Sequence, residues 1–171
     1  MIISLIGMPA TGKSTVASNL SARGALSIID VDQIIVDKIG MPLQSYIDKF
    51  GESKFLEVEE SVIFSLQVSP NSVISSGGSA CYSSTGMRHL SKQGAIQVYL
   101  LTNLETLESR LADQGKSRGI VMNGAVSWKD LLDSRHLLYS ELADICVFCD
   151  NKTPSEISSE IFQAIKAFSR V

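Results

Sequence analysis

A glycine-rich turn near the start of the chain places the strongest constraint on the fold. Residues 7–15 read GMPATGKST and match the pattern G-x-x-x-x-G-K-[ST]. They follow an isoleucine-rich run at residues 1–6, typical of a buried strand, and precede residues 16–20, typical of a helix. The order strand, glycine loop, helix is the context that this pattern requires, whereas a chance glycine-rich turn is the alternative. We therefore expect a phosphate-binding loop here.

Each residue type in this loop has its own physical role. Gly7 and Gly12 can adopt backbone angles that a Cβ atom would penalise, so the loop can turn successive N–H groups toward phosphate oxygens. Lys13 would neutralise charge on the β- and γ-phosphates, and the Ser14 hydroxyl would bind Mg²⁺. The helix that begins near Lys13 adds the positive end of its dipole. The predicted phosphate site comprises Gly7, Ala10, Thr11, Gly12, Lys13, Ser14 and Thr15.

The composition fits one globular domain and a small anionic ligand. With 171 residues, 44% of them hydrophobic and 19% charged, the chain can bury a full core, and we expect a single domain over residues 1–171. The net charge of −3 and the absence of a basic run argue against a nucleic-acid partner. No apolar run approaches the roughly 20 residues that a membrane span needs. We expect a monomer that binds small molecules, with neither nucleic acid nor membrane as a partner.

Three cysteines, Cys81, Cys146 and Cys149, bear on the cellular compartment. The last two form a C-x-x-C pattern within an apolar run typical of a buried strand, where they would point to opposite faces. Packing in the core is favoured over a redox or zinc role. The odd number of cysteines and the lack of a disulfide framework indicate a reducing compartment. Because the first predicted strand begins at Met1, no room is left for a signal peptide, and we expect a cytoplasmic protein.

Strand-like and helix-like segments alternate along the whole chain. Apolar runs typical of strands lie at residues 1–6, 26–29, 73–76, 95–101 and 144–149. Helical patterns lie at residues 13–23, 33–50, 51–67, 87–92, 103–112, 128–143 and from Ser155, which we expect to cap the last helix. A break is expected at residues 40–42, which read GMP. The alternation predicts an α/β fold, a three-layer sandwich in which a five-stranded parallel sheet is flanked by helices.

Two acids and two glycines follow the second and third predicted strands. In open parallel sheets, ligands bind at the carboxyl ends of the strands. On a continuing strand Asp30 and Asp32 would face the same way, Asp30 toward a magnesium shell and Asp32 toward a substrate hydroxyl; the alternative is a simple N-cap of the next helix. Gly77 and Gly78 would let a ligand approach the backbone closely, and the alternative there is an ordinary turn.

Other charged residues have more open interpretations. Residues 113–119, DQGKSRG, break the helical periodicity, and such a loop is typical of a mobile lid. Arg135 lies on the helix at residues 128–143, where an ion pair on the helix surface is the alternative to a functional role. The acidic side chains of the third helix are expected to be mostly solvated; they are Glu52, Glu57, Glu59 and Glu60.

The ordered set of motifs resembles the shikimate kinases, within the nucleoside-monophosphate-kinase-like families of P-loop proteins. The resemblance covers nearly the whole chain and is much more specific than the loop alone. The matching stretches are GMPATGKST at 7–15, DVD at 30–32, GESKFLEVE at 51–59, SGGSA at 76–80, SRG at 117–119, SRHLLYSELAD at 134–144 and DNKTP at 150–154. The resemblance implies a P-loop kinase fold with acceptor-binding helices at about residues 33–60 and a lid at about residues 112–124.

The resemblance also implies a role for each matched residue. Lys13 and Ser14 would hold phosphates and Mg²⁺, with Asp30 supporting the metal. Asp32 would contact the acceptor hydroxyl and act as its base. Arg118 would close on the transferring phosphate, so that Lys13, Asp32 and Arg118 form the catalytic set, as phosphoryl transfer requires. The remaining implied contacts are those of Gly77, Gly78 and Arg135 to the acceptor, and of Arg110 and Pro154 to the two sides of adenine.

Two departures from the family pattern lie on the acceptor side. The pattern F-R-x-x-E reads FLEVE at residues 55–59, so an arginine that would bind the shikimate carboxylate is Leu56. Loss of such a bidentate charged contact would weaken acceptor binding by about 2–4 kcal/mol. In addition, the family's third glycine is Ser79, and the R-P-L-L of the lid reads RGIV at residues 118–121. The nucleotide side of the pattern is intact, whereas the acceptor side has diverged.

Three functions follow from the resemblance and its departures. The first is an ATP-dependent phosphotransferase that uses Mg²⁺ and moves the γ-phosphate to a hydroxyl of a small molecule, nominally shikimate to shikimate 3-phosphate in aromatic amino acid biosynthesis. Leu56 favours a second, a kinase for a different hydroxylated acceptor, unless Lys54 or Arg88 replaces the missing arginine. The third is a non-catalytic nucleotide-binding regulator, whose mark would be the loss of Asp32 or Arg118; neither is lost.

Overall fold

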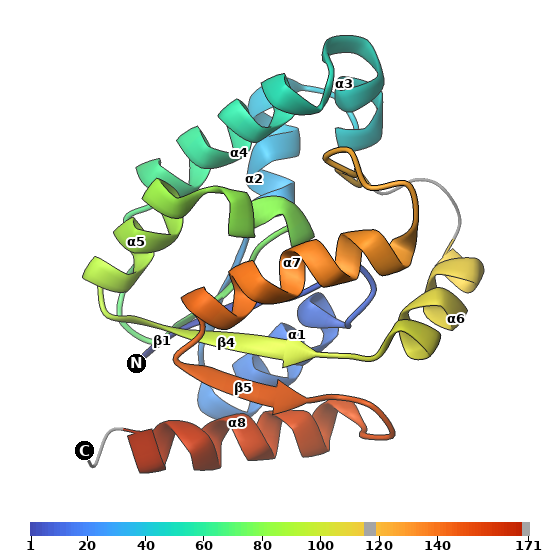
Figure 1. The fold of residues 1–171 in the computed structure, drawn as a ribbon. Coiled ribbons are helices and arrows are strands. Elements are labelled where there is room, and N and C mark those ends of the chain that lie inside the picture. Colours follow the sequence, from blue (N-terminus) through green and yellow to red (C-terminus); the bar gives the residue numbers. More distant parts are fainter. Residues whose placement is uncertain (115–118, 169–171) are drawn as a thin grey trace.

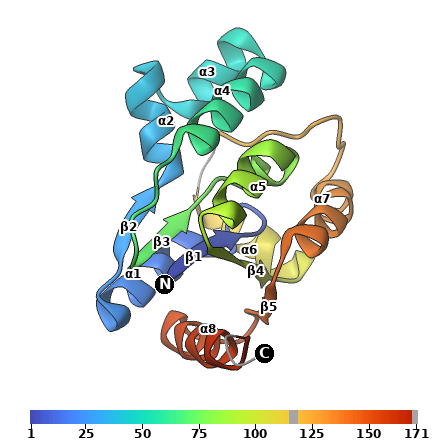
Figure 2. The same ribbon diagram turned by 90° about the vertical axis from the view of Figure 1, so that its left-hand side faces the viewer.

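The described part of the chain forms layers around a parallel sheet. The computed structural model describes residues 1–114 and 119–168. Five parallel strands form the sheet in the order β2-β3-β1-β4-β5. Figure 1 shows β4 and β5 side by side, and the whole order can be followed in Figure 2. Their bounds are β1 (Ile2–Ile6), β2 (Ser27–Asp30), β3 (Ser72–Ser75), β4 (Ala95–Leu101) and β5 (Ile145–Phe148). The expected five-stranded parallel sheet is confirmed.

Helices cover both faces of this sheet, as expected for a three-layer sandwich (Figure 2). One face carries α1 (Lys13–Gly24) and α8 (Pro154–Phe168). The other face carries α2 (Val31–Ile39), α4 (Glu52–Ser65), α5 (Ser84–Lys92) and α7 (Trp128–Leu142), and α3 (Leu43–Phe50) packs against α2 and α4. α6 (Leu104–Gln114) follows β4, and a short 3₁₀ helix, Gly78–Tyr82, follows β3.

Alternation along the middle strand β1 divides the core in two. Ile3 and Leu5 are fully buried in the cluster that contains α1 and α8, whereas Ile2 and Ile6 are buried in the cluster on the other face. A strand with both faces covered reads as a continuous apolar run, which explains the sequence IISLI. Because each such side chain stabilises the fold by about 1.5–3 kcal/mol, β1 holds the loop that follows it in a fixed position.

Most expected elements are present with slightly shifted ends. The break at residues 40–42 separates α2 from α3, and Gly40 ends α2 in the left-handed conformation, with φ 70°. β2 begins one residue later than expected and includes Asp30, and α4 ends at Ser65 rather than at residue 67. These shifts leave the sequence of strands and helices unchanged.

The cysteines of the last strand differ from expectation. Cys149 is buried, but Cys146 is exposed, so packing of both in the core is wrong for Cys146. The physical reason is that β5 lies at the edge of the sheet, where only Val147 of the strand is buried. Among the described residues, no helix combines the length and the apolar character that crossing a membrane would require.

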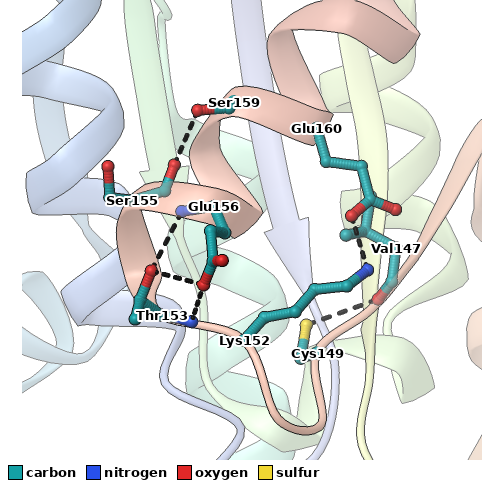
Figure 3. A network of polar contacts seen from close by, with 8 residues as sticks. All are labelled: Val147, Cys149, Lys152, Thr153, Ser155, Glu156, Ser159 and Glu160. Carbon is teal, nitrogen blue, oxygen red and sulfur yellow. Dashed lines mark hydrogen bonds and ion pairs between the residues drawn. The ribbon is translucent and has the colours of Figure 1, made fainter.

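The expectation that Ser155 caps the last helix is wrong, because Thr153 caps α8 (Figure 3). The Oγ1 atom of Thr153 accepts a hydrogen bond from the Glu156 N–H at 3.3 Å, and Glu156 Oε2 accepts bonds from the Thr153 N–H and hydroxyl, each at 2.7 Å. This reciprocal arrangement is a capping box, and its hydrogen bonds lower the pKa of Glu156. Ser155 lies inside the helix, where its Oγ accepts a bond from Arg23 Nη1 at 3.1 Å.

The capping box yields a stability prediction with a matched control. Thr153→Ala removes the cap and should lower the free energy of unfolding by about 1 kcal/mol. Ser155→Ala removes only an exposed contact and should change it by less than about 0.5 kcal/mol. Urea denaturation of both variants measures the difference. A loss in Ser155→Ala equal to that in Thr153→Ala would mean that Thr153 is not the cap.

Candidate active site

The loop between β1 and α1 is shaped by three residues with positive φ. Gly7 has φ 145°, and a Cβ atom there would lie 2.8 Å from the carbonyl oxygen of Leu100 on β4. Ala10 has φ 65°, and Gly12, the N-cap of α1, has φ 95°. The first N–H groups of a helix have no partner within that helix, so the turn at Gly12 presents a site for an anion.

Lys13 stands inside this loop. Its side chain is buried, and Nζ donates hydrogen bonds to the carbonyl oxygens of Gly7 at 2.8 Å and Met8 at 2.9 Å. These bonds tie the first turn of α1 to the end of β1. The side chains of Ser14 and Thr15, in the same turn, are exposed. An anion bound at this turn would therefore meet an ammonium group and two hydroxyl groups.

One pocket brings most of the predicted site residues together. It lies where the loop, the start of α2, the end of β3 and the segment that begins at residue 119 meet. Its lining residues are Pro9, Ala10, Gly12, Lys13, Ser14, Thr15, Asp32, Ser75, Ser76, Gly77, Gly78, Gly119 and Ile120. Gly7 and Thr11 belong to the loop but do not line the pocket. Phosphate-binding and acceptor-binding candidates thus share one space.

The two acids at the junction of β2 and α2 differ in their surroundings. The expectation that they lie on a continuing strand and face the same way is wrong, because the chain turns into α2 at Val31. Asp30 is the N-cap of α2, and its Oδ1 accepts a hydrogen bond from the Gln33 N–H at 3.1 Å. The alternative interpretation as an N-cap is confirmed for Asp30. Asp32, in the first turn of the helix, lines the pocket.

The candidates for the adenine end lie on separate elements. Arg110, on α6, donates hydrogen bonds from Nη1 to the carbonyl oxygens of Ala10 at 3.3 Å and Thr11 at 3.1 Å, so its guanidinium lies beside the loop. Pro154 is half-buried at the first position of α8. Arg118 lies outside the described residues, so the expected lid at residues 112–124 is described only at residues 112–114 and 119–124.

Arg135 is fully buried rather than paired on the helix surface. Its Nη2 donates to the carbonyl oxygen of Val121 at 2.6 Å, and its Nε donates to the Tyr82 hydroxyl at 3.2 Å. Nη1 has no hydrogen-bond partner among the described residues and lies 3.0 Å from where a Cβ on Gly78 would be. Nη1 therefore remains as a donor without a hydrogen-bond acceptor in the described part of the chain, and it lies directly behind Gly78, which lines the pocket.

Glu59 is buried beside the pocket, so the expectation that it is solvated is wrong. It is 1% exposed, and its Oε1 lies 2.8 Å from where a Cβ on Gly77 would be, with Asp32 Oδ1 2.9 Å from the same point. Burial, and to a smaller extent Asp32, raise the pKa of Glu59, whereas Ser79, Arg135 and Lys13 lower it; together these effects raise the pKa to about 7.

A sequence signal for the burial of Glu59 was present. The residue lies four positions after Phe55 and three before Val62, and both of these side chains are buried on α4. Residues at this spacing share one face of a helix. The apolar stripe of α4 therefore passes through Glu59, and the charge of the residue masked this pattern.

Glu52 is a second residue whose role was missed. Its two carboxylate oxygens accept hydrogen bonds from the backbone N–H groups of Met122 at 2.6 Å and Asn123 at 2.8 Å. Val121, between this clasp and the pocket, is the residue whose carbonyl oxygen binds Arg135. Glu52 therefore links the start of α4 to the segment 119–123, and through it to Arg135. The sequence alone gave no signal for this contact.

Neither Lys54 nor Arg88 takes the place of the arginine that is missing at Leu56. Lys54 is exposed and forms an ion pair with Glu57 at 2.7 Å. Arg88 is exposed on α5 and lines a separate surface hollow with His89. Both candidates from the sequence are thus excluded by their positions.

Replacing Glu52 by Gln tests the clasp on segment 119–123. Glutamine has nearly the same shape but presents one acceptor instead of two, so one backbone N–H loses a charge-assisted hydrogen bond worth about 1.5–3 kcal/mol. We expect the amide protons of Met122 and Asn123 to exchange with solvent about tenfold faster or more. Glu57→Gln, on the same helix, is the control. Unchanged exchange in Glu52→Gln would show that the clasp does not hold the segment in solution.

Comparisons with known proteins agree with this geometry. The family model for shikimate kinase matches residues 9–166. The shikimate kinase of Thermodesulfovibrio yellowstonii is 32% identical over 171 residues, which cover 99% of this chain and 95% of that protein. Threonine synthase-like 1 of Homo sapiens is 34% identical over 171 residues, but the match spans only 23% of its length.

A solved structure supports the same assignment. Shikimate kinase from Acinetobacter baumannii in complex with shikimate superposes with a TM-score of 0.85 at 29% identity, and covers 97% of this chain and 93% of that one. The fold, the loop and the family model all indicate the same family. The chain belongs to the shikimate kinase family.

Proposed function

We propose that this chain transfers the γ-phosphate of ATP to a hydroxyl group of shikimate. The observation that carries the proposal is the meeting of Lys13, from the loop, and Asp32, from α2, in one pocket. A phosphate cradle beside a carboxylate is the arrangement that phosphoryl transfer to a hydroxyl requires. Shikimate is the first candidate because a solved relative of 29% identity is in complex with it.

In this proposal the residues of the pocket divide the chemistry between them. The bond between the γ-phosphorus and its bridging oxygen breaks, a bond from the acceptor oxygen to phosphorus forms, and Asp32 accepts the hydroxyl proton. Lys13 and the N–H groups at the start of α1 neutralise the charge of the phosphates. Gly77 and Gly78 line the pocket with Asp32 and would contact the acceptor. Positioning and charge neutralisation therefore account for most of the catalysis.

The residues near the loop fit a magnesium ion. Among the described residues, no group of three or more His, Cys, Asp or Glu side chains could hold a metal. Mg²⁺ needs no such cluster, because it is usually bound through one or two carboxylates, phosphates and water. The exposed hydroxyl of Ser14 and the second carboxylate oxygen of Asp30 are the groups that would hold it. Bound there, the ion would neutralise charge on the phosphates.

The remaining roles stay predictions. We propose that Arg118 approaches the transferring phosphate, that Arg110 and Pro154 hold adenine, and that α2, α3 and the first part of α4 hold the acceptor. Arg110 beside the loop supports its assignment. The monomeric state and the cytoplasmic location also stay predictions.

A different hydroxylated acceptor is the second candidate. Leu56 favours it, because neither Lys54 nor Arg88 supplies a replacement charge at the pocket. The position of Asp32 in the pocket supports catalysis over nucleotide binding alone. The two acceptor candidates differ in whether shikimate is the best substrate.

Turnover assays test the proposal. Release of ADP with Mg–ATP and shikimate should be saturable. Lys13→Met should lower kcat about 10²–10³-fold by removing charge stabilisation, and Asp32→Asn about 10²–10⁴-fold by removing the base. Lys54→Met, which alters an exposed ion pair, is the matched control for lysine loss.

The acceptor is decided by the same assay. Shikimate should give the highest kcat/KM among hydroxylated acids and polyols. If the folded protein releases ADP faster with another acceptor, the second candidate holds. If no acceptor is phosphorylated by a protein that binds ATP, the proposed phosphotransferase function is wrong.

A further inference from the structure

An unpaired carboxylate lies behind the acceptor side of the pocket. Glu59 is almost completely buried, and among the described residues neither of its oxygens has a well-formed hydrogen bond, although the Ser79 side chain lies close enough to lower its pKa. It stands directly behind Gly77, which lines the pocket. A buried ionised carboxylate is costly unless it is paired, so this group requires either a cation or a proton.

Groups from four elements face Glu59. Asp32 on α2 lies against the same glycine, while Arg135 on α7 and Lys13 on α1 carry the nearby positive charges. Ser79, on the 3₁₀ helix, is the neutral neighbour. Lys13 is bonded to two carbonyl oxygens of the loop, and Arg135 uses Nε and Nη2 for Tyr82 and Val121. Burial dominates over these neighbours and keeps the pKa of Glu59 near 7.

Leu56 supplies no positive charge to Glu59 from the neighbouring turn of α4. It lies three residues before Glu59 on α4, a spacing at which side chains are neighbours on a helix. An apolar residue there leaves Arg135 as the guanidinium nearest to Glu59 among the described side chains. The remaining donor of this guanidinium, Nη1, lies behind Gly78, next to Gly77. The acidic group and the free donor thus lie behind consecutive residues of the pocket wall.

We propose that Glu59 determines how strongly Arg135 attracts an anionic acceptor, and that such an acceptor binds together with a proton that Glu59 takes up from solvent. This inference rests on the proposed function and deepens it. When Glu59 is ionised, its charge and that of Asp32 oppose the acceptor carboxylate. When Glu59 is protonated, only Asp32 of the two acids still opposes the positive charge of Arg135, and the guanidinium attracts the acceptor carboxylate more strongly. Glu59 acts through Arg135 and is a positioning residue, not a catalytic one.

The direction of the pH effect follows from linkage. An anion that arrives beside Glu59 disfavours its ionised form and raises its pKa above the value of about 7 in the free protein. Below that value the group is protonated in both states, and the affinity does not depend on it. Between that value and the higher pKa of the complex, the affinity for an anionic acceptor falls as the pH rises, by up to about tenfold per pH unit. Above both values Glu59 is ionised in both states, and the affinity no longer depends on it.

Calorimetric titration with shikimate tests the inference directly. We expect wild-type protein at pH 7.5 to take up a fraction of a proton, seen as different heats in buffers of different ionisation enthalpy. Glu59→Gln, neutral at every pH, should show less proton uptake and a flatter Kd between pH 6 and 8. Glu57→Gln, exposed on the same helix, is the matched control and should behave as wild type. KM for shikimate should follow Kd, with kcat changed less.

A second variant keeps the test decisive if Glu59→Gln does not fold. Leu56→Arg places a guanidinium one turn from Glu59 and should hold Glu59 ionised, so proton uptake should disappear. The added positive charge offsets the ionised carboxylate and attracts the anionic acceptor, so binding should tighten. Binding of shikimate with the same proton uptake in every variant would overturn the inference alone. Proton-linked binding without phosphate transfer would overturn only the proposed function. Absence of shikimate binding between pH 6 and 8 would overturn both.

Discussion

The turn that joins β1 to α1 is the constraint on which the rest of the structure depends. β1 lies in the middle of the sheet with both faces buried, and Lys13 is bonded back to the carbonyl oxygens that follow it. Gly7 passes so close to Leu100 that no side chain fits. The phosphate loop is therefore held against two strands. The other site residues follow the carboxyl ends of neighbouring parallel strands, which places them around this loop.

Three charged side chains lie close together at the pocket wall formed by Gly77 and Gly78. Asp32 and Glu59 lie against the same glycine, and Arg135 stands behind the next one. Segment 119–123 connects Arg135 to the start of α4 through the carbonyl oxygen of Val121 and the Glu52 clasp. The position of the guanidinium is thus set by the same segment that lines the pocket at residues 119 and 120. Segment 119–123 is therefore physically connected to the buried guanidinium behind Gly78.

Local patterns predicted the fold and the phosphate side of the site. The glycine loop, the alternation of strands with helices, and Asp32 and Gly77 near the strand ends all follow from short-range signals, and the structure brings them together. The wrong predictions concern residues whose burial or exposure depends on tertiary contacts. Glu59 is buried because its helix face meets the pocket wall, and Cys146 is exposed because no strand lies beyond β5. The Glu52 clasp joins residues about 70 positions apart, which no local pattern predicts.

Calorimetry with Mg–ATP tests most directly the claim that this turn grips a nucleotide. We expect saturable heat with one site per chain for the folded wild-type protein, because backbone N–H groups, Lys13 and Ser14 converge on one pocket. Adenosine, which lacks phosphates, should bind far more weakly. Heat no greater than that of dilution, from protein with intact secondary structure, would contradict the central claim.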